Sequence, residues 1–317
     1  MIPEAHRDIL AAFGLPPQVS ALQLCAEAPV YRVRTAQGDR IVKRTRAPIE
    51  AGVAIGRWTR SLVEGGIASV APVEEIAPNP RAFGAEIWVV YPFIDGQEYR
   101  GERPQLGAAG ALLGRIHGAG LEADFGLEVR ERVVAVAPEE ITGSAAAALE
   151  HLERARPGKA GRLEEAVCER AARYFDEALP RALEARLPLS NCSWDYKAGN
   201  LVFETPTRPV LIDPDSGGRI PKAYDLAIAA FLFPNSAPEA PRRTLTRREW
   251  LVFLEAYQRE CPLDEAEVRC WEDLLLCAWM DEALWLLGDN ARGWDDPVER
   301  TWLWSLMTVD LATYRLA

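Results

Sequence analysis

The stretch CSWDYKAGNLVFETPTRPVLIDPD, residues 192–215, holds the side chains best suited to chemistry. Asp195 is followed five residues later by Asn200, and Asp213 comes thirteen residues after that asparagine. Phosphoryl transfer needs such a set: a carboxylate beside the attacking hydroxyl, and oxygen ligands that hold magnesium against nucleotide phosphates. Lys197 adds an ammonium group two residues after Asp195, where it can offset charge developing on a phosphate.

Two strand-like runs, LVFE and PVLIDPD, follow Asn200 and are separated by turn residues. A hairpin of this kind returns the chain to its starting point. It would place Asp213 beside Asn200, so that both side chains reach one metal ion. We therefore predict Asp195 and Lys197 as catalytic residues, and Asn200 and Asp213 as metal ligands.

The same stretch resembles the catalytic loop and metal-binding segment of the aminoglycoside phosphotransferase and choline kinase-like family. Asp195 and Asn200 match the family's catalytic loop, and Asp213 and Asp215 match its Ile-Asp motif. The YDLA run at residues 224–227 matches a third family motif, at the expected distance. The resemblance implies a small-molecule kinase distantly related to protein kinases, with Asp215 as a further metal ligand or a supporting group.

Two positions depart from the family pattern. Ser193 stands where the family has histidine, and Trp194 stands where it has glycine. The family histidine mainly braces the loop, so its loss keeps an alternative open: a nucleotide-binding pseudokinase with a scaffold or regulatory role. A protein kinase is a weaker alternative, because GxGxxG, DFG and APE-like segments are absent and Tyr224 follows Asp215 by only nine positions.

The N-terminal third supplies the predicted nucleotide-binding residues. PVYRVRT and RIVKRT form a predicted hairpin around Gln37-Gly38-Asp39, and it puts Lys43 on a strand. A strand lysine of this kind binds the α- and β-phosphates in kinase-like folds. The resembled family pairs this lysine with a glutamate on the next helix; Ile55 occupies that position here, and Glu50 is the candidate acid.

WVVYPFIDG, residues 88–96, resembles the segment that joins the two lobes in kinase-like enzymes. Adenine would be read there by main-chain groups of Pro92 and Ile94. Pro92 lacks an N–H group, so it can only accept a hydrogen bond.

The sequence pattern changes near Asp95-Gly96, from mainly strand-like to mainly helical. Before it come a short helix at residues 6–14, a helical run at 55–62 and strand-like runs, two of which span 69–77 and 85–93. After it helical periodicity dominates, interrupted by the strand-like runs near residues 200–213. We predict an α+β, two-lobed, protein-kinase-like fold: a small antiparallel sheet lobe over residues 1–94 and a mostly helical lobe over residues 95–317.

Composition narrows the function further. The chain has 317 residues, a net charge of −11, three histidines and six cysteines without a CxxC pair. The negative charge argues against nucleic-acid binding, and the scattered cysteines argue against a zinc or disulfide framework. The longest apolar runs are too short to cross a membrane, and the N-terminus lacks the pattern of a secretory signal. We therefore expect a cytoplasmic protein without membrane or nucleic-acid partners.

These observations lead to one functional prediction. The protein is expected to move the γ-phosphoryl group of ATP, or of GTP, to a hydroxyl of a small molecule, with Mg²⁺ as cofactor. The candidate acceptors are an aminoglycoside-like antibiotic, another cationic amino alcohol and a sugar-like metabolite. The acidic charge tilts the choice slightly toward cationic acceptors, although an acidic surface is more commonly explained by solubility alone. Asp281, Glu282 and Asp289 are possible ligands for such a cation, and acids on solvated helix faces are the commoner explanation for such residues.

Overall fold

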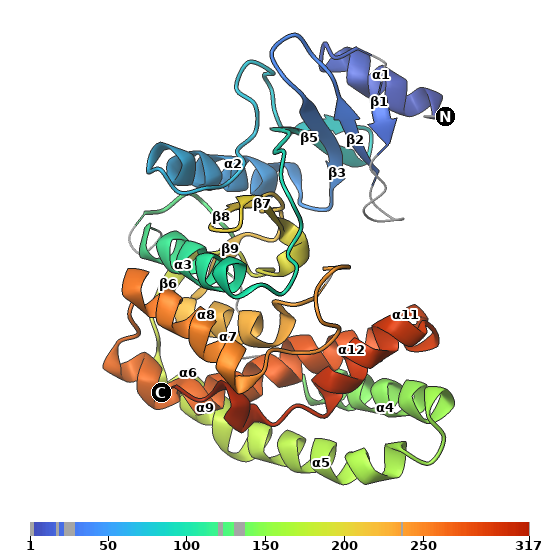
Figure 1. The fold of residues 1–317 in the computed structure, drawn as a ribbon, viewed down its shortest axis with the longest axis vertical. Coiled ribbons are helices and arrows are strands. Elements are labelled where there is room, and N and C mark those ends of the chain that lie inside the picture. The colour runs from blue at the N-terminus through green and yellow to red at the C-terminus, as the bar shows by residue number, and fades with distance from the viewer. Residues whose placement is uncertain are drawn as a thin grey trace.

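A five-stranded antiparallel sheet forms the upper lobe of the computed structural model, above a larger lobe that is mostly helical (Figure 1). The structure describes residues 3–16, 19–21, 29–119, 123–129, 137–235 and 237–316. The sheet order is β1-β2-β3-β5-β4. Its strands are β1 (Val19–Ala21), β2 (Val30–Val33), β3 (Arg40–Thr45), β4 (Arg81–Phe83) and β5 (Glu86–Pro92). The predicted α+β, two-lobed fold is confirmed.

Alternation along the strands gives the sheet two different faces. One face carries Val42 and Trp88, and it packs against helix α1 (Glu4–Ala12) through Leu10. The opposite face carries Lys43, which lies opposite Val89 in the pairing of β3 with β5. The predicted hairpin of β2 and β3 is confirmed. The lysine therefore points toward the rest of the molecule, away from α1.

Helix α2 (Ile49–Glu64) lies beneath the sheet and buries Ile55, Trp58 and Leu62. The predicted strand at residues 69–77 is wrong: only Ser69 makes an isolated bridge, to Leu211. Pro72 lacks an N–H group, and the segment leaves α2 to contact the lower lobe rather than extend the sheet. The sheet and the lower lobe are thereby joined by backbone hydrogen bonds as well as by the connecting chain.

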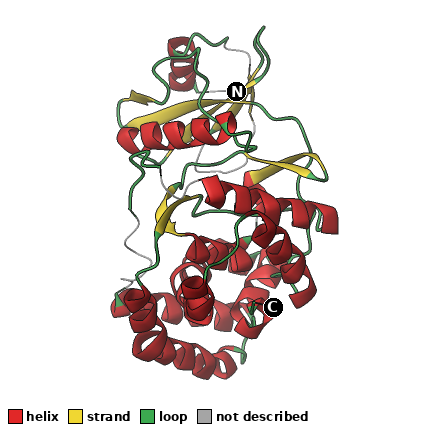
Figure 2. Ribbon diagram, turned by 90° about the vertical axis from the view of Figure 1, so that its left-hand side faces the viewer, coloured by secondary structure: helices red, strands yellow, loops and turns green. Residues whose placement is uncertain are grey.

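Helices build most of the lower lobe, as the red ribbons of Figure 2 show. They are α3 (Arg103–Ala119), α4 (Pro138–Ala155), α5 (Ala160–Arg173), α6 (Leu179–Ala185), α7 (Lys222–Leu232), α8 (Arg247–Glu260), α9 (Glu265–Ala278), α10 (Leu284–Asp289), α11 (Ala291–Asp295) and α12 (Pro297–Met307). Two π-helical turns, η2 (Tyr174–Ala178) and η4 (Trp279–Ala283), join consecutive helices, and the 3₁₀ turns are η3 (Ala198–Asn200) and η5 (Leu311–Tyr314). None of the helices in the described ranges is long and apolar enough to cross a membrane.

Two short antiparallel ladders lie between the sheet and the helices (Figure 1). They pair β6 (Leu189–Cys192) with β9 (Gly218–Pro221), and β7 (Leu201–Thr205) with β8 (Arg208–Leu211). The chain that leaves β5 runs along β7, where Gln97 and Phe203 exchange backbone hydrogen bonds of 2.9 and 2.8 Å. The predicted hairpin after Asn200 is confirmed, and it lies directly below the sheet.

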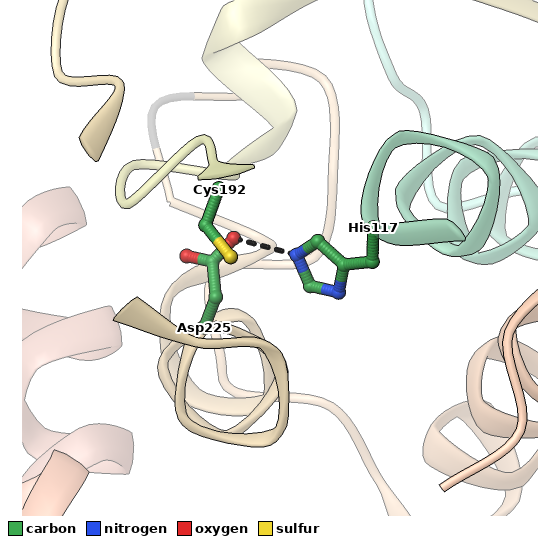
Figure 3. A group of neighbouring side chains, drawn as sticks. All are labelled: His117, Cys192 and Asp225. Carbon is green, nitrogen blue, oxygen red and sulfur yellow. Dashed lines mark hydrogen bonds and ion pairs between the residues drawn. The ribbon is translucent and has the colours of Figure 1, made fainter. Parts of the chain in front are cut away.

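Helices α3 and α8 pack closely because glycines face α8. A Cβ atom at Gly114 would lie 2.6 Å from the Tyr257 carbonyl oxygen. This approach lets His117 of α3 hydrogen-bond the Tyr257 hydroxyl at 2.9 Å. The other ring nitrogen of His117 lies 2.9 Å from the Asp225 carboxylate (Figure 3). Cys192 lies beside them, and burial raises the pKa of its thiol well above the ordinary value. His117, with both ring nitrogens engaged, links α3 to α7 and α8.

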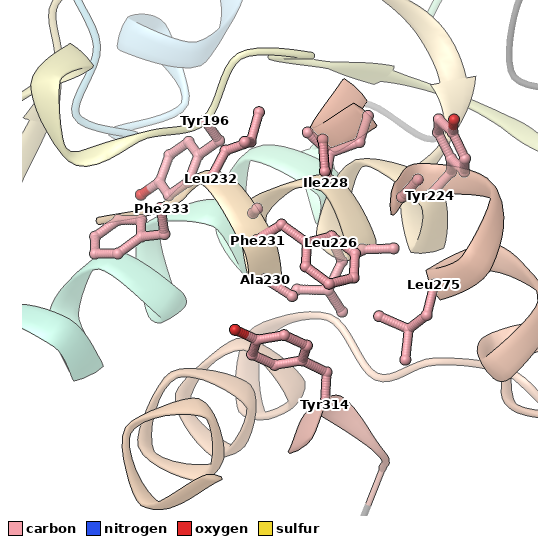
Figure 4. Packing of buried hydrophobic residues seen from close by; sticks show 14 of the residues in the cluster. Tyr196, Tyr224, Leu226, Ile228, Ala230, Phe231, Leu232, Phe233, Leu275 and Tyr314 are labelled. Atoms are coloured by element: carbon pink, nitrogen blue, oxygen red, sulfur yellow. The ribbon is translucent and has the colours of Figure 1, made fainter. Parts of the chain in front are cut away.

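Helix α7 forms the centre of the lower lobe, with side chains buried around its whole circumference. Figure 4 shows Leu226, Phe231 and Phe233 packed among neighbouring elements, with Tyr314 of the C-terminal segment beneath them. A helix that is apolar on all sides must be covered on all sides. Core packing therefore explains much of the YDLA run.

Candidate active site

The loop after β6 carries the predicted catalytic residues. Ser193 is buried, and within the described residues its hydroxyl has no hydrogen-bond partner. Trp194 adopts a φ of 59°, in the left-handed region that bulky residues rarely occupy. Its indole Nε1 donates a 2.9 Å hydrogen bond to Glu282 of η4. The two family departures thus produce a turn with a left-handed tryptophan that ties the loop to the C-terminal helices.

Asp195, Lys197 and Asn200 converge in this loop. The Lys197 ammonium lies 2.7 Å from Asp195 Oδ2, and Asn200 Nδ2 donates to the same oxygen at 3.0 Å. Asn200 Nδ2 also donates to the Asp195 carbonyl at 2.8 Å. The Asp195 carboxylate is therefore held by charge-assisted hydrogen bonds, which are stronger than neutral ones.

The hairpin returns Asp213 to the same place. The Ile212 amide donates a 2.9 Å hydrogen bond to the Asn200 carbonyl, so the residue before Asp213 lies against the end of the loop. The Gly217 backbone then packs on helix α2: a Cβ there would lie 2.7 Å from the Trp58 ring. The segment that carries Asp213 and Asp215 is thus fixed from both lobes.

Lys43 reaches this segment from the sheet. Its ammonium lies 2.7 Å from Asp213 Oδ1 and 3.0 Å from Asp215 Oδ2. Burial alone would lower the pKa of Lys43, but the carboxylates of Asp215 and Asp213 outweigh it and raise the pKa. The lysine therefore stays charged. The structure brings the three predicted residues together across a sequence separation of 170 residues.

The candidate acid for Lys43 on helix α2, Glu50, is not among the partners of the lysine in the structure. Glu50 is exposed, and no ion pair joins it to Lys43 among the described residues. Ile55, at the matching position, instead lines a small cavity together with Tyr91 and Asp215. Asp213 and Asp215 are the carboxylates that contact Lys43.

Pro92 and Ile94 lie at the edge of this site. Pro92 ends β5 and pairs with Arg40. The amide of the next residue, Phe93, donates a 3.1 Å hydrogen bond to the Asp39 carbonyl. The Ile94 side chain packs on an apolar cluster that joins the sheet to the hairpin; its buried members are Val70, Val89, Tyr91 and Val210. The structure thus places Ile94 beside this apolar surface.

The sequence reasoning missed Tyr91. Its buried hydroxyl donates a 3.1 Å hydrogen bond to Asp215 Oδ1, and burial raises its pKa well above the ordinary value, so it remains a donor. A signal was present: alternation along WVVYPF puts Val89 and Tyr91 on one face of the strand. Pairing of Val89 with Lys43 makes that face the one that carries the lysine.

Comparisons with known proteins identify the family and the fold. Residues 19–263, more than half of the chain, match the model of the phosphotransferase enzyme family. The chain belongs to this family. No curated protein matches the sequence.

Solved structures with the same fold include several small-molecule kinases. A microcompartment-associated aminopropanol kinase superposes with a TM-score of 0.66 at 13% identity, covering 95% of this chain and 94% of that one. An aminoglycoside phosphotransferase from Alicyclobacillus acidocaldarius superposes with a TM-score of 0.61 at 15% identity, covering 99% of this chain and 95% of that one. A spectinomycin phosphotransferase solved with ADP and spectinomycin gives 0.59 at 15%, covering 100% and 99%. These likenesses establish the protein-kinase-like fold.

The oxygen atoms of this phosphotransferase-family site fit a magnesium ion. Asn200 uses Nδ2 for both hydrogen bonds to Asp195, which leaves its amide oxygen as the atom able to bind metal. The Asp213 side chain is 44% exposed, so its carboxylate has room for a ligand besides Lys43. Carboxylate and amide oxygens are the hard ligands that magnesium prefers.

A second acidic group lies beside the loop, on the π-helical turn η4. Glu282 accepts from Trp194, and Asp281 accepts from the Tyr224 hydroxyl at 3.1 Å. Burial, followed by the charge of Asp281, raises the pKa of Glu282 to about 7. The negative potential of Asp195 contributes as well, so Glu282 lies within electrostatic reach of the catalytic loop.

Proposed function

We propose that the protein transfers the γ-phosphoryl group of ATP, or of GTP, to a hydroxyl group of a small molecule that carries an amine. One observation carries this proposal: Lys43 of the sheet meets Asp213 of the hairpin, next to a loop in which Asn200 and Lys197 hold Asp195. Family membership and the fold shared with small-molecule kinases support it.

In the proposed reaction Asp195 orients the acceptor hydroxyl and receives its proton. A bond forms between the acceptor oxygen and the γ-phosphorus, the bond to the β-phosphate oxygen breaks, and ADP or GDP leaves. A loose transition state requires little base strength, so a carboxylate suffices as acceptor of the proton. Lys197, 2.7 Å from Asp195, offsets charge on the transferred group.

The nucleotide would lie between the lobes. Lys43 binds the α- and β-phosphates, and Asn200 and Asp213 hold Mg²⁺. Bound there, the ion would neutralise charge on the phosphate oxygens. Main-chain groups of Pro92 and Ile94 accept and donate to the base, which rests on the apolar cluster around Ile94. We assign nucleotide binding mainly to residues 1–94 and acceptor binding to residues 95–317.

The acceptor is proposed to be a cationic amino alcohol or an aminoglycoside-like molecule. Asp281 and Glu282 place two carboxyl groups on η4, next to Trp194 and the catalytic loop. A protonated amine bound there would bring a neighbouring hydroxyl toward Asp195. The aminopropanol kinase and the spectinomycin phosphotransferase with the same fold are named for substrates of this chemistry.

The test is nucleotide-dependent phosphorylation of a panel of amino alcohols and aminoglycosides, with Asp195→Ala beside the wild type and Asp8→Ala as control. Asp8 is exposed on α1, far along the chain from the loop. We expect turnover that requires magnesium, and a fall in kcat of about 10³-fold in Asp195→Ala alone.

Thermal stabilisation by ATP and GTP, measured on the same samples, separates the other outcomes. Stabilisation without turnover on any acceptor would favour the pseudokinase function over the kinase. If the protein showed no turnover and no stabilisation by ATP or GTP, the proposed nucleotide binding would be overturned.

A further inference from the structure

The two carboxylates that contact Lys43 differ in their surroundings. The Asp213 side chain is 44% exposed, whereas the Asp215 side chain is 18% exposed and the Lys43 side chain 11%. Asp215 accepts from the buried Tyr91 hydroxyl through Oδ1 while Oδ2 contacts Lys43. Each carboxylate oxygen of Asp215 therefore has a protein partner, and Asp213 is the one open to a ligand.

Tyr91 and Lys43 lie on one face of the sheet. They belong to neighbouring strands, in the register that pairs Lys43 with Val89 and Ile41 with Tyr91. Two strand residues with fixed directions thus hold opposite oxygens of one carboxylate. Such an arrangement restrains a flexible lysine side chain, which otherwise loses rotamer entropy when it binds a phosphate.

Helix α2 offers no competing acid at this point. Its acids Glu50 and Glu64 are exposed, and Ile55 lines the same small cavity as Asp215. Asp215 is fixed in turn by the chain that follows it, because Gly217 packs against Trp58 of α2. The carboxylate thus sits between the sheet and α2.

We propose that Asp215 is a positioning residue for Lys43, holding its ammonium toward the nucleotide phosphates, with Tyr91 fixing the Asp215 carboxylate. This assignment rests on the proposed nucleotide binding and differs from the metal-ligand role expected from the sequence. Asp213 serves the metal, and Asp215 serves the lysine. The two carboxylates thus have different roles because Asp213 is more exposed to solvent than Asp215.

The experiment is a double-mutant cycle on ATP affinity, measured by titration calorimetry with the full chain. Its members are the wild type, Lys43→Met, Asp215→Asn and the double variant, each at low and high Mg²⁺. Glu86→Gln is the matched control, because Glu86 loses an ion pair with Arg44 on the same sheet. Circular dichroism melting shows that each variant is folded before its affinity is measured.

We expect Asp215→Asn and Lys43→Met each to weaken ATP binding about tenfold, and the double variant to bind no more weakly than Lys43→Met. Excess Mg²⁺ should leave the Asp215→Asn defect in place, and Glu86→Gln should bind as the wild type does. Tyr91→Phe should weaken ATP binding about threefold, and only when Asp215 is present.

Additive losses in the double variant, or recovery of Asp215→Asn in excess Mg²⁺, would overturn the proposal in favour of a metal ligand. Unchanged ATP affinity in Asp215→Asn would overturn it as well. A wild type that fails to bind ATP would instead overturn the proposed function, so the two failures are distinguishable.

Discussion

Two polar clusters flank the catalytic loop, and they are built differently. The front cluster consists of Lys43, Asp213, Asp215 and Tyr91, between the sheet and the hairpin. The back cluster consists of His117, Asp225 and Tyr257, between helices α3, α7 and α8. Both contain a carboxylate, a nitrogen base and a tyrosine hydroxyl. Both join segments that are far apart in the sequence.

Their exposure separates them. The His117 and Asp225 side chains are 0% exposed, whereas the Asp213 side chain is 44% exposed. A buried polar group without a partner is costly, so the back cluster cannot exchange partners and must remain intact. The front cluster has an open carboxylate and can accept ligands. Similar side chains are therefore fully buried in one place and partly open to solvent in the other.

The largest expected effect comes from breaking the back cluster. His117→Ala should lower the free energy of unfolding by about 3–5 kcal/mol, because it removes the partner of a fully buried carboxylate. The other Asp225 oxygen, Oδ1, has no hydrogen-bond partner within the described residues, so nothing there compensates. Urea unfolding followed by circular dichroism measures the change.

His151→Ala is the matched control for this substitution. His151 lies on α4, and its ring Nδ1 is 3.2 Å from the Arg154 guanidinium in an exposed setting. We expect its substitution to change the unfolding free energy by less than about 0.5 kcal/mol. Equal losses in the two variants would show that the back cluster has no special role in stability.

An intermediate effect is expected from Glu282, whose pKa responds to carboxylates of both regions: Asp195 near the front cluster and Asp225 in the back one. Its pKa of about 7 exceeds the ordinary value of 4.5, chiefly because of burial. Between these values the folded state binds more protons than the unfolded state, so stability is fully present below pH 4.5 and is lost as pH rises through 7.

The wild type should therefore lose on the order of 1–3 kcal/mol of unfolding free energy between pH 5 and pH 8 through this group. Glu282→Gln should flatten that decline, as seen in urea unfolding at a series of pH values. Glu255→Gln, an exposed acid paired with Arg259, should leave the decline unchanged. Parallel pH profiles for the wild type and Glu282→Gln would contradict the assignment.

Much of this organisation could be predicted from the sequence, where the signals are local. Alternation of apolar and polar residues and a Gly-containing turn predicted the β2–β3 hairpin that carries Lys43. Two strand-like runs separated by turn residues after Asn200 predicted β7 and β8. The strand predicted at residues 69–77 is wrong, because this segment passes between the lobes and makes single backbone hydrogen bonds to each, at Leu211 and Val90, instead of a continuous ladder. The proposed roles of the site residues stay predictions until they are measured.

Contacts between distant segments could not be predicted. The bond from Tyr91 to Asp215 spans 124 residues, and the bond from Trp194 to Glu282 spans 88. The first depends on the register of two strands relative to a loop in the other lobe. The second depends on a left-handed tryptophan and on a π-helical turn, neither of which the residue types favour.

The smallest expected effect makes the comparison sharpest, because the same chemical change is made in each cluster. Tyr257→Phe removes the hydroxyl bonded to His117 at 2.9 Å, where no water can replace it, so stability should fall by about 1–2 kcal/mol. Tyr91→Phe removes a 3.1 Å hydrogen bond to Asp215. The Asp215 carboxylate still contacts Lys43 and is partly exposed to water, so the free energy of unfolding should fall by less than about 1 kcal/mol.

ATP affinity should respond in the opposite order: weaker in Tyr91→Phe, unchanged in Tyr257→Phe. Urea unfolding and titration calorimetry on the same two proteins give both quantities. If Tyr257→Phe instead weakened ATP binding as much as Tyr91→Phe, the back cluster would belong to the site as well as to the fold. Opposite rankings in the two measurements would show that exposure, and not the identity of the side chains, decides what each cluster does.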